Sequence, residues 1–326
     1  MKHIGILTSG GDAPGMNAAI RAVVRVAINK GLKVTGVLAG YQGLIKNDFI
    51  PLGSQSVRGI IQNGGTVLRS ARCDEFRTEE CQKIAANNMK KAKMDALVVI
   101  GGDGTFRGAN DLSSRFAIPV VGIPGTIDND IYGTEYTIGY DTCLNTVVEA
   151  VDKIRDTASS HNRIFFVEVM GHESGFVAMH SGLSCGAEVI LIPEQKNQLE
   201  KVRNFLKDRA CTNKSSVVMV AESVEGGAMS IADKMKAEFP QFEIRVSVLG
   251  YIQRGGSPSA RDRILASELG AAAVHALLDN KSGCMVGFIH GKLHYESFGT
   301  AVKMHKKIDA DFIRMAESIG TYTPID

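Results

Sequence analysis

The chain has 326 residues, 44% of them hydrophobic and 22% charged, and its formal net charge is +2. At roughly 100 to 200 residues per domain, this length predicts two domains. The composition excludes a membrane protein, since no apolar run approaches the roughly 18 residues that a membrane helix needs. It also gives little reason to expect nucleic-acid binding, because the chain has no block of Lys and Arg and no Trp for base stacking.

Cysteine usage and the first residues both favour a cytoplasmic protein. The six cysteines are scattered, without a CxxC pair or a Cys and His cluster of zinc spacing, so we interpret them as reduced thiols or as residues that fill the core. The stretch MKHIGILTSGGD passes from a short apolar run straight into a glycine turn, and it lacks the length and the cleavage site of a secretory signal. We therefore expect no membrane partner and no nucleic-acid partner.

Apolar strands and amphipathic helices alternate along the chain. Residues 3–9 predict a strand, residues 16–31 a helix with apolar residues at helical spacing, and residues 33–40 the next strand. The same texture recurs at 94–116 with 118–125, at 163–175, at 216–223 and at 245–256. This alternation predicts an α/β fold with mainly parallel sheets, in which ligands bind at loops beyond the carboxyl ends of the strands.

The first glycine loop, TSGGDAPG, follows the first predicted strand. Its residues Gly10, Gly11 and Gly15 let backbone N–H groups approach an anion at a helix N-terminus, which is typical of a phosphate-binding loop. A tight turn without a ligand explains the same glycines equally well, so the segment alone leaves both interpretations open.

A second loop of this kind, VVIGGDGTFRG, adds a carboxylate. Asp103 is the residue type that Mg²⁺ needs when its other ligands are waters and phosphate oxygens. The alternative is an Asp that caps the following helix. We favour the metal, because Asp103 beside bound phosphates would repel them without an ion. Neither glycine loop contains the lysine of a Walker-type site.

The segment TVLRSARCDEF supplies Arg69 and Arg72 ahead of two acidic residues. A guanidinium group is permanently charged and binds phosphate oxygens through two N–H groups, so it can stabilise charge that grows during phosphoryl transfer. The alternative for either arginine alone is an exposed salt bridge. The neighbouring glycine loops favour the first interpretation.

The stretch GIPGTIDNDIYGT holds Thr126, Asp128 and Asp130 just after a predicted strand. We expect strict alternation to send the two carboxylates in different directions and to give them different tasks. One acts as a base toward a substrate hydroxyl. The other holds the loop, binds the substrate or faces the metal and its ligands. The alternative is an Asx turn that only satisfies backbone donors. Together, these segments are the parts of a kinase that works by positioning and electrostatic stabilisation.

Four motifs, taken in order, carry a resemblance to a known family. They are GGDGT at 101–105, PGTIDND at 124–130, MGHESG at 170–175 and GYIQRGGSP at 250–258. With these motifs the chain closely resembles the bacterial ATP-dependent 6-phosphofructokinases over essentially its whole length. The pair PGTIDND and QRGGSP is highly specific.

The resemblance implies two Rossmann-like α/β lobes with mainly parallel sheets and the active site in the cleft between them. Residues 1–139 with 254–307 are expected to form the large ATP-binding lobe, and residues 140–253 with 308–326 the smaller sugar-phosphate-binding lobe. The implied reaction phosphorylates the C1 hydroxyl of D-fructose 6-phosphate with ATP and Mg²⁺, and gives fructose 1,6-bisphosphate and ADP in the committing step of glycolysis.

Site residues follow from the resemblance, position by position. Asp128 matches the base that accepts the proton of the C1 hydroxyl, and Thr126 and Arg72 contact the transferred phosphoryl group. The full catalytic set is Asp128, Thr126, Arg72, Asp130 and Gly11. The ATP side, with Asp103 placed for Mg²⁺, is Gly11, Tyr41, Arg72, Cys73, Gly102, Asp103, Gly104 and Thr105. The sugar-phosphate side is Thr126, Ile127, Asp128, Arg163, Met170, Gly171, His172, Glu222, Arg245, Tyr251 and Arg254.

The resemblance also bears on assembly and on the phosphoryl donor. Arg163 and Arg245 resemble residues that the family contributes from a neighbouring subunit, which implies a homotetramer. Gly104 and Gly125 stand where pyrophosphate-dependent relatives have Asp and Lys, so ATP is the expected donor.

Two substrate positions depart from the commonest bacterial pattern: His172 replaces an arginine and Tyr251 a histidine. Arginine stays charged, whereas a histidine side chain, with a reference pKa of about 6.5, is often neutral. We therefore predict a KM for fructose 6-phosphate that rises with pH. The alternative is that neighbouring groups such as His161 or Arg163 already hold the phosphate.

The family's effector site is matched in part. The candidate residues are Arg21, Arg25, Arg155, Gly186, Glu188 and Lys214. The loop ACTNKSS has Cys211 and Asn213 at positions where the family usually has lysine, so we predict weak or absent activation by ADP.

Three rival functions remain at this stage. GGDGT alone also occurs in NAD-kinase-like and lipid-kinase-like proteins, but PGTIDND with QRGGSP argues against both. Gly104 and Gly125 disfavour pyrophosphate as the phosphoryl donor. A catalytically silent sensor of nucleotide or sugar phosphate would keep the fold without activity, although the intact catalytic set disfavours it.

Overall fold

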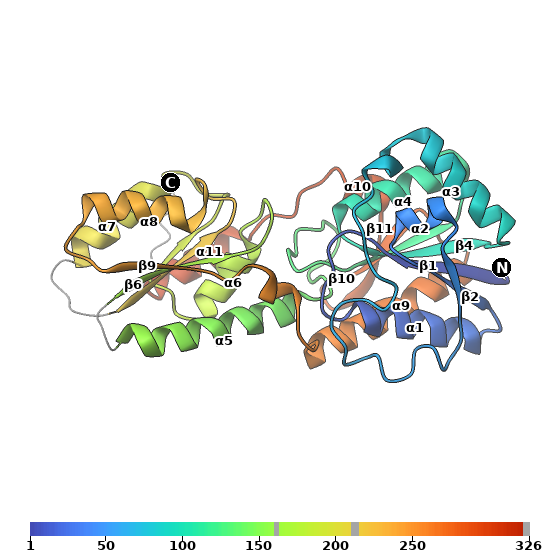
Figure 1. Cartoon of the computed structure of the whole chain (residues 1–326), viewed down its shortest axis with the longest axis horizontal. Helices are drawn as coiled ribbons and strands as arrows, with labels where there is room; N and C mark the ends of the chain where they lie inside the picture. Colours follow the sequence, from blue (N-terminus) through green and yellow to red (C-terminus); the bar gives the residue numbers. More distant parts are fainter. Residues whose placement is uncertain (160–162, 210–214, 322–326) are drawn as a thin grey trace. The chain divides into compact units, whose positions relative to one another are not determined.

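The structure, a computed structural model, describes residues 1–159, 163–209 and 215–321. The chain forms two compact units (Figure 1). Unit 1 comprises Met1–Ile127, Ile131–Thr142 and Arg254–Lys306, and unit 2 comprises Asp128–Asp130, Cys143–Gln253 and Lys307–Asp326. Each unit is built around its own β-sheet.

Among the described residues, the sheet of unit 1 has seven strands in the order β11-β10-β5-β4-β1-β2-β3. Their bounds are β1 His3–Thr8, β2 Lys33–Val37, β3 Phe49–Leu52, β4 Ala96–Gly101, β5 Val120–Pro124, β10 Cys284–Ile289 and β11 Lys292–Ser297. The inner strands pair in parallel, while β3 and β11 pair antiparallel at the two edges. Every residue of β4 is buried, as expected for a parallel strand that is covered on both faces.

Helices cover both faces of this sheet (Figure 1). Their bounds are α1 Met16–Asn29, α2 Tyr41–Lys46, α3 Glu79–Lys91, α4 Asp103–Phe116, α9 Ala260–Leu278 and α10 Phe298–Ala301, with a 3-10 turn, η1, at Asp74–Arg77. Helices α1 and α9 lie together on one face, and α2, α3 and α4 lie on the other. Gly270 of α9 permits the close approach to α1, because a Cβ atom there would lie 2.7 Å from Cβ of Ala22.

The sheet of unit 2 has four parallel strands among the described residues, in the order β7-β8-β6-β9. The bounds are β6 Ile164–Val169, β7 Val189–Leu191, β8 Ser216–Ala221 and β9 Ile244–Val248. The helices are α5 Tyr140–Ser159, α6 Phe176–Ser184, α7 Gln198–Arg209, α8 Gly227–Glu238 and α11 Ala310–Ser318, with a 3-10 turn, η2, at Gly250–Arg254. The α/β architecture with mainly parallel sheets that the sequence predicts is confirmed.

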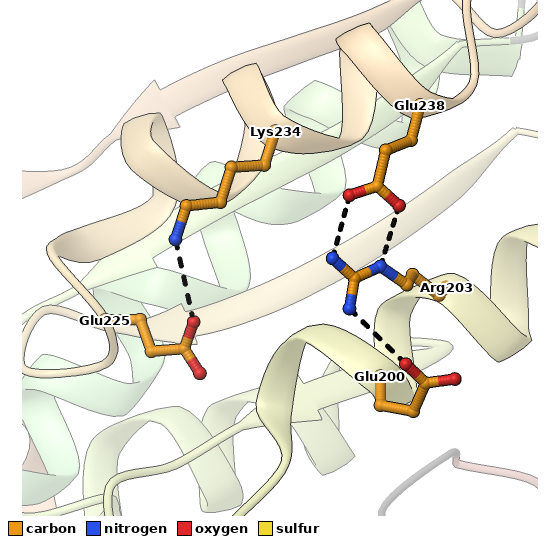
Figure 2. Close-up of polar contacts among 5 residues, drawn as sticks. All are labelled: Glu200, Arg203, Glu225, Lys234 and Glu238. Atoms are coloured by element: carbon orange, nitrogen blue, oxygen red, sulfur yellow. Dashed lines mark hydrogen bonds and ion pairs between the residues drawn. The ribbon is translucent and has the colours of Figure 1, made fainter.

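Ion pairs join α7 to α8 on the outside of unit 2 (Figure 2). The guanidinium of Arg203 donates to both carboxylate oxygens of Glu238, at 2.7 and 2.8 Å, and to Glu200 at 3.3 Å. Lys234 and Glu225 form a longer pair at 4.0 Å. Among the residues placed by the structure, no helix combines the length and the hydropathy needed to cross a membrane.

Candidate active site

The strands β1, β4 and β5 are neighbours in the sheet of unit 1, so the loops after them share one edge. Backbone hydrogen bonds join these loops: Ser9 donates to the carbonyl of Ile100 and Gly125 to that of Gly101, both at 3.0 Å. The hydroxyl of Thr105 donates to the carbonyl of Ser9 at 3.0 Å. The structure therefore brings together both glycine loops and the start of the PGTIDND segment.

The first glycine loop leads into the N-terminus of α1. Gly15, the N-cap residue, has a φ of 105°, and a glycine has no side chain with which to cap the first backbone N–H groups. Such groups can bind an anion. A Cβ atom on Gly11 would lie 2.2 Å from a guanidinium nitrogen of Arg254, so a side chain there would displace the end of that arginine. Gly11, expected on the ATP side, and Arg254, expected on the sugar side, are thus in contact.

The segment that carries Arg72 is fastened to this loop by hydrogen bonds. Thr8 donates its hydroxyl to the carbonyl of Arg69 at 2.7 Å, and Ser70 donates its hydroxyl to the carbonyl of Gly10. Arg69 adopts a left-handed backbone conformation with a φ of 57°. The side chain of Arg72 is exposed. The backbone around Arg72 is therefore held in place while its guanidinium stays available to a phosphate.

Asn17, which was not among the predicted site residues, holds the turn at residues 63–67, just before the segment that carries Arg72. It is buried on α1 and donates to the carbonyls of Asn63 and Gly64, each at 3.1 Å, while its own carbonyl accepts from Val67 at 2.8 Å. A polar side chain on the apolar face of a helix is the signal that could have revealed it, since buried polar groups need partners.

Asp103 is the first residue of α4, and Gly102 is its N-cap. The Oδ2 atom of Asp103 accepts from Nε of Arg107 at 2.9 Å, one turn further along the helix. A negative charge in the first turn is favoured by the helix dipole. The described residues contain no cluster of three or more His, Cys, Asp or Glu side chains suited to a metal. Any ion here would need ligands from a bound phosphate or water.

Gly104 and Gly125, the two small residues expected to bear on the donor, differ in their surroundings. Among the described residues, nothing lies within 4 Å of a Cβ atom built on Gly104. A Cβ atom on Gly125 would lie 3.0 Å from Cγ2 of Ile100 and 3.3 Å from Cε of Met16. Packing therefore gives a reason for the glycine at 125 and gives none at 104.

Tyr41 contacts the second glycine loop, and Cys73 follows Arg72 along the chain. Tyr41 is buried, its ring stacks on Phe76 with centroids 4.1 Å apart, and its hydroxyl donates to the carbonyl of Thr105 at 2.5 Å. Burial raises the pKa of the Tyr41 phenol, which keeps it a hydrogen-bond donor. Burial likewise raises the pKa of the half-buried Cys73 thiol. Tyr41 thus supports the first turn of α4 through the backbone of Thr105.

The PGTIDND segment is held at Thr126, whose carbonyl accepts from the hydroxyl of Thr137 at 2.6 Å. Asp128 and Asp130 are half-buried, whereas Ile127 is only 2% exposed. Alternation gives no reason for the two carboxylates to diverge, because residues two apart in an extended segment point to the same side. Asn129, with a φ of 53°, also interrupts the extended backbone between them.

In unit 2, β6 lies between β8 and β9, so the loops after these strands are neighbours. Glu222 accepts from the backbone N–H groups of Gly171 at 3.3 Å and His172 at 2.8 Å. The side-chain carbonyl of Gln253 accepts from the N–H of Met170 at 3.2 Å. Four residues expected on the sugar-phosphate side, Met170, Gly171, His172 and Glu222, are therefore brought together, and the side chain of His172 is exposed.

Comparison with known proteins assigns the chain to a family. The family model described as Phosphofructokinase matches residues 3–277. A protein of Bacteroides thetaiotaomicron named ATP-dependent 6-phosphofructokinase 2 is 51% identical over 98% of this chain and 99% of its own length. The chain belongs to the phosphofructokinase family.

Further comparisons agree with this assignment. A protein of Thermus thermophilus named ATP-dependent 6-phosphofructokinase 1 is 52% identical over 98% of this chain and 100% of its own length. The solved structure of phosphofructokinase from Saccharomyces cerevisiae matches with a TM-score of 0.83 and 32% identity, over 99% of this chain and 47% of the yeast chain. The resemblance carried by the four motifs and the phosphofructokinase fold are both confirmed.

Other residues expected at a phosphofructokinase site lie at the surface of unit 2. Arg163 and Arg245 both donate to Oε1 of Glu243, at 2.8 and 2.6 Å. The hydrogen bond from Arg245 and the one from Arg163 lower the pKa of the Glu243 carboxyl. Tyr251 is 82% exposed.

The expected effector residues of the phosphofructokinase family fall into separate groups. In unit 1, Arg25 lines a cavity of about 470 Å³, while Arg21, one helical turn before it on α1, is half-buried. The cavity lining is Arg25, Ile28, Asn29, Ser54, Gln55 and Arg58. In unit 2, Arg155 pairs with Glu188 at 3.4 Å and donates to the carbonyl of Gly186. Lys214, with His161, Cys211 and Asn213, lies outside the described residues.

Proposed function

We propose that this chain phosphorylates the C1 hydroxyl of D-fructose 6-phosphate with ATP and produces fructose 1,6-bisphosphate and ADP. The observation that carries the proposal is the match, over nearly the whole chain, to proteins named ATP-dependent 6-phosphofructokinase. The juxtaposed glycine loops of unit 1 support it, because they offer helix N-termini to the phosphates of a nucleotide.

Asp128 is the base of this reaction: its carboxylate takes the proton of the C1 hydroxyl as that oxygen attacks the γ-phosphorus. Thr126 faces the transferred group, and Arg72 stabilises the charge that spreads over its oxygens. Three contacts support these roles: Thr126 is held at its carbonyl by Thr137, it neighbours Gly102, and the backbone before Arg72 is fastened to the first glycine loop. Asp130 and Gly11 shape the same site.

The residues present fit a Mg²⁺ ion. Asp103 offers one partly exposed carboxylate at a helix start beside the glycine loops, which is the usual protein contribution when phosphate oxygens and waters would supply the other ligands. When bound, the ion neutralises charge on the nucleotide phosphates. The nucleotide side is then lined by Gly102, Gly104 and Thr105. Tyr41 and Cys73 lie next to this lining.

The two units divide the substrates between them. Unit 1, with the glycine loops, binds ATP, and unit 2, with Met170, Gly171, His172 and Glu222, binds the sugar phosphate. Arg254 contributes to the sugar-phosphate side, together with Thr126 and Ile127. This division follows the expected lobes, residues 1–139 with 254–307 and residues 140–253 with 308–326.

The enzyme works as a homotetramer in the cytoplasm, and Arg163, Arg245 and Tyr251 act at substrate sites shared between subunits. Two arginines gathered on one carboxylate at the protein surface support this, since they leave a net positive charge for a phosphate. The candidate effector residues remain Arg21, Arg25, Arg155, Gly186, Glu188 and Lys214, and the basic cavity at Arg25 supports an anionic effector.

One assay tests the function. Purified protein is given fructose 6-phosphate with either ATP or pyrophosphate at equal Mg²⁺, and product is measured by coupled oxidation of NADH. Activity with ATP is expected, and Asp128→Asn should lower kcat by roughly 10² to 10⁴. Asp233→Asn, which changes an exposed carboxylate on α8, is the matched control. Phosphorylation of NAD without activity on fructose 6-phosphate would overturn the proposal, and an undiminished Asp128→Asn would remove the assigned base.

A further inference from the structure

The loop between β6 and α6 is closed by Ser174. Its backbone N–H donates to the carbonyl of Gly171 at 2.9 Å, and its hydroxyl reaches the same carbonyl at 2.9 Å. Gly171 has a φ of 150°, and a Cβ atom there would lie 2.7 Å from the carbonyl oxygen of Ser174. The turn therefore needs glycine at its first position, and the serine fastens its last.

The hydroxyl of Ser174 has a second acceptor, the carbonyl oxygen of Asp128 at 3.3 Å. A serine hydroxyl has a single proton, which is shared between two acceptors on this side. Ser174 is only 9% exposed, so these contacts lie where water competes little. A buried hydroxyl thus spans the substrate loop and the backbone of the residue proposed as base.

The residues on both sides of Ser174 are themselves held by hydrogen bonds. The loop therefore cannot easily rearrange if the side chain of Ser174 shifts. On one side, Glu222 holds the N–H groups of Gly171 and His172. On the other side, Glu194 accepts from the N–H of Gly175, the N-cap of α6, at 2.8 Å. The loop is therefore fixed at both ends, with Ser174 in the middle.

We propose that Ser174 is a positioning residue that couples the sugar-phosphate loop, residues 170–174, to the backbone of Asp128. The inference rests on the proposed function, in which that loop holds the sugar phosphate and Asp128 takes the proton of the hydroxyl. The hydroxyl sets the distance between the carboxylate and the substrate without touching the substrate. Misplacement of a reacting group by about 1 Å can lower a rate by roughly 10².

A pair of variants isolates the hydroxyl. Ser174→Thr and Ser174→Val have side chains of the same shape, and only the first keeps the hydroxyl. Both keep the backbone hydrogen bond to Gly171, so the turn itself is retained. Both variants add the same methyl-sized group at this buried position, so the comparison is between the two of them: we expect kcat/KM for fructose 6-phosphate to be roughly 10- to 100-fold lower in Ser174→Val than in Ser174→Thr. The KM for ATP should change by less than about twofold in both, because its binding residues belong to unit 1.

Ser181→Ala is the matched control, because Ser181 is also buried, lies on α6 and donates its hydroxyl to a backbone carbonyl, that of Val177. It should lower the melting temperature without a selective effect on fructose 6-phosphate. Equal kinetics of the Thr and Val variants, or a Val variant that changes both substrate constants alike, would overturn the role of Ser174. A wild-type protein without activity on fructose 6-phosphate would instead overturn the proposed function, before any variant is compared.

Discussion

The Oδ2 atom of Asp103 accepts two contacts from Arg107, from Nε at 2.9 Å and from a terminal guanidinium nitrogen at 2.8 Å. Both side chains are substantially exposed, at 63% for Arg107 and 40% for Asp103. An exposed pair of this kind contributes little to folding stability. Its effect falls instead on the availability of the carboxylate, because the proposed Mg²⁺ ion and the guanidinium would compete for the same oxygen.

This competition leads to a prediction about Mg²⁺. Asp103→Asn should raise the Mg²⁺ concentration needed for half-maximal activity, because an amide carries no charge toward the ion. Arg107→Gln should lower that concentration, because it releases the carboxylate. Titration of MgCl₂ at a fixed ATP concentration measures both, and binding of Mn²⁺ followed by electron paramagnetic resonance provides a readout that does not depend on turnover. Identical metal requirements for wild type and Asp103→Asn would place the ion elsewhere.

A second prediction concerns His172. Its backbone is held by Glu222 in a left-handed conformation with a φ of 55°, while its side chain is exposed. A guanidinium can bind a phosphate through two N–H groups at once, whereas an imidazole offers a single ring donor to it. His172→Arg should therefore lower the KM for fructose 6-phosphate, measured at one fixed pH. An unchanged KM would assign the phosphate to other cations.

Regulation by ADP is the subject of a third prediction. Cys211 and Asn213 replace two expected cations, and each charge-assisted hydrogen bond to a ligand is worth about 1.5 to 3 kcal/mol when well formed. We expect ADP to leave the saturation curve for fructose 6-phosphate almost unchanged. The double variant Cys211→Lys with Asn213→Lys should make the curve shift with ADP. A strong response of the wild type to ADP would contradict the prediction.

The fourth prediction uses two glutamates whose pKa values move in opposite directions. Burial raises the pKa of Glu194 above its usual 4.5, while the hydrogen bond from Arg203 lowers that of Glu238 (Figure 2). The folded state therefore binds a proton on Glu194 more tightly than the unfolded state does, and stability from this group falls as pH rises through the raised pKa. For Glu238 the contribution is present above 4.5 and is lost as pH falls through the lowered pKa.

Urea unfolding of Glu194→Gln and Glu238→Gln, each compared with wild type from pH 7 to pH 4, tests this contrast. Relative to Glu194→Gln, the wild type should gain stability as pH falls. Relative to Glu238→Gln, it should keep its advantage down to pH 4.5 and begin to lose it only below that pH. Differences that follow pH with the same sign for both variants would contradict the assignment.

The sequence predicts the fold well because its signal is local. The fully buried strand at Ala96–Gly101 and the alternation of strands with helices are visible in the order of apolar residues, and the glycine loops mark where strands end. The order of strands in a sheet is not local, so the adjacency of β1, β4 and β5 required the structure.

The contacts that hold the site were less predictable, for physical reasons. Asn17 and Ser174 act through hydrogen bonds to backbone groups 46 residues or more away, as in Asn17 with Asn63 and Ser174 with Asp128. Spacing along the chain carries no trace of such pairs. The alternation argument for Asp128 and Asp130 carries no weight, because it assigned opposite sides to residues that share a side in an extended segment. It also assumed an extended backbone, whereas Asn129 has a positive φ.

The difference between Gly104 and Gly125 has a consequence for the order in which this enzyme can acquire new properties. A side chain at 104 meets open space among the described residues, so substitution there can alter the proposed nucleotide side without disturbing the core. A side chain at 125 must displace Ile100 or Met16 by a few tenths of an ångström. If evolution or engineering changes the phosphoryl donor, we therefore expect residue 104 to be substituted first. A substitution at residue 125 should be tolerated only after β4 or α1 has adjusted.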